Sequence, residues 1–109
     1  MNKRKETAMA EEDRKALRRC AVHFVGQVQG VGFRWTSRRI ALELGLTGWV
    51  RNEWDGSVRM ELQGTPDAIS SFFGKLQNAY RDFPIDYRID DIVDIAPVED
   101  EGPFTVKLR

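Results

Sequence analysis

One arginine at the end of a glycine-rich stretch is surrounded by the residue types that chemistry on a small anion needs. Residues 26–34 read GQVQGVGFR and lie between a strand-like run and a helix-like run. Glycine lets backbone N–H groups approach a ligand closely, because no Cβ stands in the way. The Arg34 guanidinium adds a planar fork of donors that suits a tetrahedral oxyanion. A glycine-rich turn of this kind, closed by an arginine, is a candidate anion cradle.

The stretch runs into an expected helix N-terminus, where several N–H groups lack intrahelical partners and the helix dipole favours negative charge. Neither a lysine nor a serine or threonine follows Gly32 directly, so the stretch is not a nucleotide P-loop. Its glycine spacing also differs from that of the dinucleotide-binding fingerprint. A small phosphate or phosphoryl group is therefore the expected ligand, although the same glycines would also serve a tight strand-to-helix turn.

Apolar periodicity predicts the elements that position this stretch. The sequence SVRMELQ alternates apolar and polar residues, as is typical of a strand with one buried face. Thr65 and Pro66 are typical of a helix cap and first helical residue. Ile92 departs from the alternation of its strand, which predicts a β-bulge or bend. The expected strands are 20–28, 46–52, 57–63, 87–95 and 104–109, and the expected helices are 33–44 and one that begins at Pro66.

The element order is βαββαβ with a short final strand. We expect an α+β, ferredoxin-like two-layer sandwich, with an antiparallel sheet and both helices on one face. In that fold the first two strands run parallel with the third between them, so their carboxyl ends meet at one edge. The glycine loop and Asn52 follow these two strands and should therefore lie close together. The Asn52 carboxamide can both donate and accept a hydrogen bond, although asparagine beside Asp55-Gly56 is also a common turn residue.

Composition restricts the class of protein. The 109 residues carry no net charge, so the overall charge does not favour nucleic acid or an anionic membrane as a partner. Residues 1–18 lack large apolar side chains apart from Met9 and Leu17, so we expect a flexible N-terminal extension before one domain at 19–109. The single cysteine excludes an internal disulfide, and no apolar run is long enough to span a membrane. We expect a cytoplasmic monomer.

Two longer motifs resemble the signatures of the acylphosphatase family. Residues 26–34 match a G-x-V-Q-G-V-x-F-R string, and residues 48–58 match G-W-V-x-N-x-x-D-G-x-V. The resemblance covers essentially the whole expected domain. It implies a ferredoxin-like fold and hydrolysis of the carboxyl-phosphate bond of acyl phosphates without a metal or cofactor. It also implies that Arg34 binds phosphate and that Asn52 orients the attacking water. The phosphate-binding loop that it implies consists of the backbone amides of Gln29, Gly30, Val31, Gly32 and Phe33.

Hydrolysis of an acyl phosphate suits a site that offers no general acid. Carboxylic acids have pKa values of about 4, so the carboxylate leaves without being protonated. The site then has to hold the phosphoryl group, neutralise charge on its oxygens and place a water in line. We expect the substrate's own phosphate to accept the proton of that water. The expected small-molecule partners are an acyl phosphate as substrate and inorganic phosphate as product or competing ligand.

Two other functions are compatible with the same element order. A domain of this fold could bind a phosphoryl group or carbamoyl phosphate without turning it over, and only a turnover measurement would separate it from an enzyme. RNA-binding modules also have this order, but they stack bases on aromatic side chains of the central strands. The outward positions of strand 57–63 hold no aromatic residue, so we expect no nucleic-acid partner.

Overall fold

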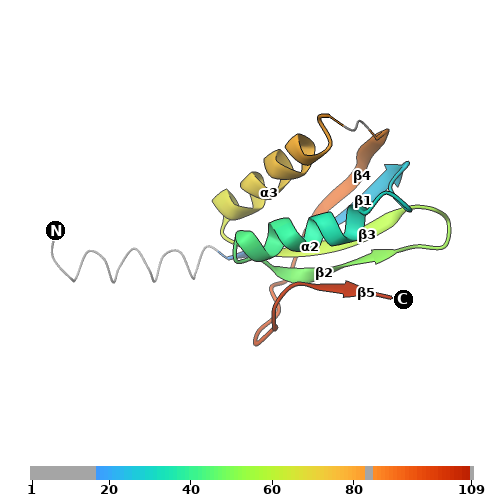
Figure 1. Cartoon of the computed structure of the whole chain (residues 1–109). Helices are drawn as coiled ribbons and strands as arrows, with labels where there is room; N and C mark the ends of the chain where they lie inside the picture. Colours follow the sequence, from blue (N-terminus) through green and yellow to red (C-terminus); the bar gives the residue numbers. More distant parts are fainter. Residues whose placement is uncertain (1–16, 83–84, 109) are drawn as a thin grey trace, which may run out of the picture.

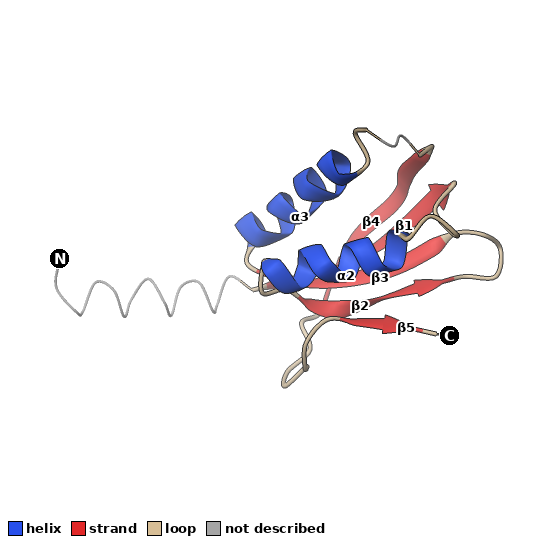
Figure 2. Cartoon of the chain, in the orientation of Figure 1, coloured by secondary structure: helices blue, strands red, loops and turns tan. Residues whose placement is uncertain are grey.

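The computed structural model describes residues 17–82 and 85–108 as a sheet covered on one face by two helices (Figure 1). Coloured by secondary structure, the helices form one layer and the strands the other (Figure 2). The ferredoxin-like prediction is thereby confirmed. The elements are β1 (Arg18–Gly26), α2 (Phe33–Glu43), β2 (Thr47–Asn52), β3 (Val58–Gly64), α3 (Pro66–Ala79), β4 (Tyr87–Ile95) and β5 (Thr105–Lys107).

The strand order β4-β1-β3-β2-β5 places β3 between β1 and β2 and antiparallel to both. The carboxyl ends of β1 and β2 therefore meet at one edge of the sheet, as predicted. The expected antiparallel sheet is correct for the first four strands, whereas β5 runs parallel to β2. The reason is that the chain crosses the sheet after β4 and enters the far edge at Pro103, which bridges to Thr47 at the start of β2.

A continuous apolar core lies between the sheet and the two helices. Val22 and Phe24 of β1 share one face with Val58 and Met60 of β3, because antiparallel partners point the same way. Thr65 caps α3 by accepting a hydrogen bond from the Ala68 amide, as predicted. The helices contribute their buried apolar positions to this core, namely Phe33, Ile40, Ala41, Phe72 and Leu76.

The predicted bulge in β4 is present and lies at Asp90. His23 of β1 pairs with Asp91, and the next residue, Phe24, pairs with Ile89, so that Asp90 is the extra residue. A bulge re-aims the side chain that it inserts. The Asp90 carboxylate consequently lies 3.3 Å from His23 Nδ1, which gives that histidine a partner that the sequence did not indicate.

β1 begins at Arg18, the last residue of the predicted extension, and Arg18 pairs with Gly64 of β3. Its guanidinium forms an ion pair with Asp94 of β4. The sheet therefore starts one residue earlier than the domain at 19–109 that the sequence suggested. Residues 1–16 of the predicted extension lie outside the described residues.

Arg19 organises the face of the sheet that carries no helix. Its side chain is only 2% exposed and contacts Glu61 at 2.8 Å and both carboxylate oxygens of Glu101, at 2.7 and 3.0 Å. Gln63 also accepts from Arg19 and bonds the backbone of Val98 in both directions. These contacts fix the connection between β4 and β5 across the sheet, because a buried guanidinium requires compensating acceptors.

The Arg19–Glu101 pair predicts a specific loss of stability in acid. The hydrogen bonds from Arg19 hold the pKa of Glu101 below its ordinary value of 4.5. A depressed pKa in the folded state means that the stabilisation is present above pH 4.5 and is lost as the pH falls through the lower folded value. Glu101→Gln should lower the free energy of unfolding at pH 7 by about 1–3 kcal/mol.

Thermal or urea unfolding between pH 3 and pH 7 would measure this effect. The difference in unfolding free energy between Glu101→Gln and the parent protein should become small at the acid end of the series. Glu99→Gln is the matched control, since Glu99 is an exposed carboxylate of the same connection. Equal stability losses in the two variants would show that Glu101 has no special role.

Candidate active site

The loop between β1 and α2 has a backbone conformation suited to holding an anion. Gly30 and Gly32 have φ values of 76° and 73°, in the left-handed region that residues with a Cβ rarely adopt. A Cβ built on either glycine meets nothing within 4 Å, so the space above both is open. Gly32 is also the N-cap residue of α2, which starts at Phe33 and has no side-chain cap. The first amides of α2 therefore remain available to a ligand.

Apolar packing fixes both ends of this loop. Val28 and Phe33 are fully buried on either side of the glycines. The Phe33 ring meets Phe24 edge to face, with centroids 5.0 Å apart, and stacks on Tyr80 at 6.0 Å. The Tyr80 hydroxyl approaches the Val31 carbonyl oxygen at 3.4 Å. The loop is therefore held in place before any ligand arrives, which reduces the cost of ordering it on binding.

Gln29 connects the loop to the end of β2. Its Nε2 donates to the carbonyl oxygens of Glu53 and Ser57, the latter at 2.8 Å. These residues flank the β2–β3 turn, so one carboxamide ties together the two segments that carry the predicted motifs. The sequence placed Gln29 in the phosphate cradle through its backbone, but it gave no signal for this side-chain contact.

Asn52 is the last residue of β2 and lies level with the end of β1. It pairs with Val58 of β3, which pairs in turn with Phe24 of β1. These three residues point to the helix-covered face, and adjacent strands are about 5 Å apart, so Asn52 lies roughly 10 Å across the sheet from Phe24. Asn52 Oδ1 is buried and accepts no hydrogen bond from a described residue. A buried acceptor without a partner is costly, which is consistent with a bound water in that place.

Arg34 lies in the first turn of α2, which packs against β2. Its side chain is half-buried. Within residues 17–82 and 85–108, no carboxylate lies within ion-pairing distance of it. By contrast, four arginines of the strands are each paired with an acid, namely Arg18, Arg19, Arg51 and Arg59. The topology thus brings the loop, Arg34 and Asn52 to the same edge, and the guanidinium keeps its charge available to an anion.

The β2–β3 turn beside Asn52 is closed by hydrogen bonds between its own residues. The Asp55 carboxylate accepts from the amide and the hydroxyl of Ser57, at 2.9 and 2.6 Å. These hydrogen bonds lower the pKa of Asp55. Trp54 projects from this turn and is 89% exposed. It borders a hollow of about 230 Å³, which Arg51, Asn52 and Glu53 complete.

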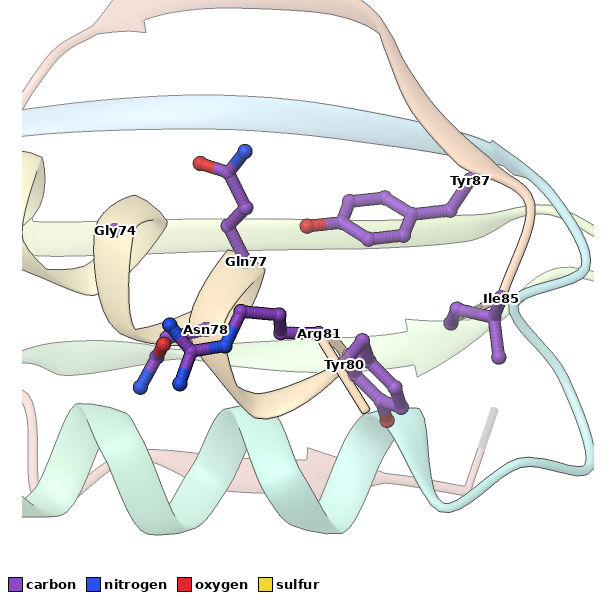
Figure 3. Close-up of a pocket in the computed structure, with 7 residues that line it drawn as sticks. All are labelled: Gly74, Gln77, Asn78, Tyr80, Arg81, Ile85 and Tyr87. Atoms are coloured by element: carbon purple, nitrogen blue, oxygen red, sulfur yellow. The ribbon is translucent and has the colours of Figure 1, made fainter. Parts of the chain in front are cut away.

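A larger hollow of about 500 Å³ lies between the end of α3 and the start of β4, on the other flank of the loop (Figure 3). Neither Arg34 nor Asn52 lines it, so size alone does not identify the catalytic position. Tyr80 belongs both to this hollow and to the support of the loop. The lining residues are Gly74, Gln77, Asn78, Tyr80, Arg81, Ile85 and Tyr87.

The link through Gln29 predicts a measurable role in positioning. Gln29→Ala removes the donor from two carbonyl oxygens and loosens the loop relative to Asn52. For the acyl phosphate hydrolysis that the two motifs imply, we expect kcat/KM to fall about tenfold, since leaving one partner of a hydrogen bond unsatisfied costs on the order of 1–3 kcal/mol. Steady-state kinetics beside Gln27→Ala would check this, because Gln27 is an exposed residue of the same loop. Equal kinetics in the two variants would argue against the link.

The sequence as a whole also matches a known family. The family model described as Acylphosphatase matches residues 20–105, which include the loop, Arg34 and Asn52.

The chain belongs to the acylphosphatase family.

Relatives of full domain length agree with this assignment. An acylphosphatase from Nitratidesulfovibrio vulgaris is 47% identical over 89 residues, which cover 78% of this chain and 85% of that protein. The solved acylphosphatase from Coxiella burnetii is 30% identical with a TM-score of 0.67, and the match covers 88% of this chain and 98% of that one. The chain is thus an enzyme, an acylphosphatase that hydrolyses the carboxyl-phosphate bond of acyl phosphates.

The same fold also occurs inside a longer protein. The solved HypF from T. kodakarensis is 32% identical with a TM-score of 0.67, and the match covers 84% of this chain but only 12% of HypF. Two negative findings apply to the described residues of the present chain. No three histidine, cysteine, aspartate or glutamate side chains are grouped as metal ligands would be, and no helix is long and apolar enough to cross a membrane.

Proposed function

We propose that the loop amides of residues 29–33 and Arg34 bind the phosphoryl group of an acyl phosphate, while Asn52 orients the water that attacks phosphorus. The amides and the guanidinium neutralise charge on the phosphoryl oxygens, which is the main requirement of phosphoryl transfer. The Asn52 carboxamide offers a donor and an acceptor, so it can both hold a water and aim its lone pair.

The reaction balances with these groups alone. The water oxygen forms a bond to phosphorus, the bond between phosphorus and the carboxyl oxygen breaks, and the carboxylate leaves with the electron pair. Because the carboxylate is a weak base, no residue has to protonate it. The proton of the water passes to an oxygen of the substrate's own phosphate, and the products are a carboxylate and inorganic phosphate.

The observation that carries the proposal is the buried Oδ1 of Asn52, which accepts no hydrogen bond from any residue that the structure describes and lies at the sheet edge that also holds the glycine loop and Arg34. A structural asparagine in a turn would satisfy its own oxygen with a nearby amide. The same edge would bind inorganic phosphate as product or competing ligand.

Hydrolysis of benzoyl phosphate in ¹⁸O-labelled water, with a metal chelator present, tests the proposal. The expected result is catalysed release of phosphate that carries one atom of the label. Label in the benzoate would mean attack at carbon, which this arrangement does not explain. Phosphate binding without turnover would indicate a binding domain for a phosphoryl group or carbamoyl phosphate instead.

We further propose that the domain of residues 19–109 carries the activity as a monomer in the cytoplasm. All residues with a proposed role belong to one chain and one sheet edge. The single cysteine, Cys20, is buried, and burial raises the pKa of its thiol, which favours the unreactive form.

A further inference from the structure

Three cations stand side by side on the face of the sheet that carries no helix, next to the proposed site. Val50 of β2 is buried under the helices, so its neighbour Arg51 points to the opposite face. Arg51 pairs with Arg59 of β3 on one side and with Lys107 of β5 on the other. Cross-strand partners project from the same face, so the three side chains form a row whose ends are roughly 10 Å apart. Arg59, Arg51 and Lys107 are called the cationic row below.

The cationic row adjoins the residues of the proposed site directly. Arg51 precedes Asn52 in β2, and Arg59 follows Val58, the residue that pairs with Asn52. Arg51 and Asn52 also line the same hollow of about 230 Å³ at the end of β2. The row therefore lies one residue, about 3.4 Å along the strand, from the side chain that is proposed to hold the attacking water.

The positive charge of the cationic row is only partly neutralised. Arg51 and Arg59 share one carboxylate, that of Glu53, at 2.9 and 3.7 Å. Within the part of the chain that the structure describes, no carboxylate lies within ion-pairing distance of Lys107. Three neighbouring cations with one acid leave a net positive field beside the site.

Trp49 holds two of these cations in place without cancelling their charge. The Arg51 guanidinium lies 5.0 Å from the centroid of the Trp49 ring, and the Lys107 ammonium lies 4.3 Å from it. A cation over the face of an aromatic ring is attracted by the quadrupole of the ring, which carries no net charge. The row therefore keeps both a fixed position and its positive charge.

The other edge of the sheet carries the opposite charge. β4 lies at the edge farthest from β5 (Figure 1) and holds three aspartates, Asp90, Asp91 and Asp94, against the single arginine Arg88. The whole chain has no net charge, so any attraction of an anionic substrate has to come from the distribution of its charges. An anion that approaches the site is therefore attracted to the side of β2 and β5 and repelled from the side of β4.

We infer that the cationic row attracts the anionic acyl phosphate to the loop and Asn52, and that it lowers KM in this way without taking part in the chemical step. The inference rests on the proposed function, since it needs the phosphoryl group to bind at that edge of the sheet. Charges that act through solvent lose their effect when salt screens them. The screening length is about 30 Å at 0.01 M ionic strength and about 10 Å at 0.1 M.

Reversing the charge of Lys107 tests the inference, because this side chain is exposed and lies at the end of the row. In Lys107→Glu we expect kcat/KM for benzoyl phosphate to fall about tenfold at an ionic strength of about 0.01 M, with kcat within about twofold of the parent value. At about 0.5 M the loss in kcat/KM should shrink to less than about twofold. Arg59→Gln, which removes one charge instead of reversing it, should show the same pattern with a loss of about threefold at low salt.

Lys75→Glu is the matched control, because it changes the net charge by the same amount at an exposed position of α3, in the layer on the other face of the sheet. Its kcat/KM should stay within about twofold of the parent value at both ionic strengths. Three results would overturn the inference: unchanged kcat/KM of Lys107→Glu at low salt, equal losses in the two lysine variants, or a loss in Lys107→Glu that persists at high salt. Failure of the parent protein to hydrolyse benzoyl phosphate would instead overturn the proposed function.

Discussion

Arg34→Ala is expected to lower kcat/KM for benzoyl phosphate by about 10²–10³-fold, the usual effect of removing a donor that stabilises the transition state. Arg34 lies in the first turn of α2, directly after the loop whose glycines leave the backbone amides accessible. It has no carboxylate partner among the described residues, so its removal leaves no buried acid uncompensated. The variant should therefore fold normally and lose anion binding specifically.

Inhibition by inorganic phosphate separates this result from a general loss of structure. In Arg34→Ala the inhibition constant for phosphate should rise along with the loss of turnover. Arg38→Ala is the matched control, because Arg38 is an exposed arginine one turn further along the same helix. If the inhibition constant for phosphate were the same in Arg34→Ala and in the parent protein, Arg34 would not be part of the phosphate site. Equal losses in both arginine variants would indicate a general electrostatic effect of α2.

Asn52→Ala is expected to reduce kcat by about 10²-fold or more while phosphate still inhibits at nearly the parent concentration. The reason is that the carboxamide acts on the attacking water, whereas the loop amides and Arg34 hold the phosphoryl group. The buried Oδ1 has no acceptor role toward the described protein, so its loss breaks no hydrogen bond of the fold. Asn52→Asp should not restore activity, because a carboxylate repels the phosphoryl oxygens.

The contrast between kcat and phosphate inhibition is the informative readout for Asn52. Gln27→Ala, which removes an exposed carboxamide, provides the control for substitution of an amide near the domain surface. If kcat of Asn52→Ala stayed within a few-fold of the parent value, Asn52 would be a turn residue and another group would have to position the water.

The sequence predicted most of the fold because local signals agreed with one another. Alternation in residues 57–63, the cap at Thr65 and the break near Ile92 each correspond to an observed strand, helix start or bulge. It also predicted that the loop and Asn52 share an edge, since this follows from the strand order alone. Such features depend on nearest neighbours in sequence or on topology, and both can be recognised in a single chain.

Features that depend on distant side chains could not be predicted. No local signal indicates that Arg19, the first residue of the predicted domain, is buried, because Glu61 and Glu101 reach it from 42 and 82 residues away. The side-chain contact of Gln29 depends on two carbonyl oxygens of the β2–β3 turn. The parallel direction of β5 depends on where the chain crosses the sheet. The alternation of Phe104, Val106 and Leu108 predicts a strand but cannot indicate its direction relative to β2.

A crystal structure with inorganic phosphate, at a concentration that inhibits turnover, tests the central claim most directly. The phosphate should accept hydrogen bonds from backbone amides within residues 29–33 and from the Arg34 guanidinium, with a water between it and the Asn52 carboxamide. Phosphate bound to Arg81 or elsewhere, with the loop and Arg34 unoccupied at that inhibitory concentration, would contradict the claim.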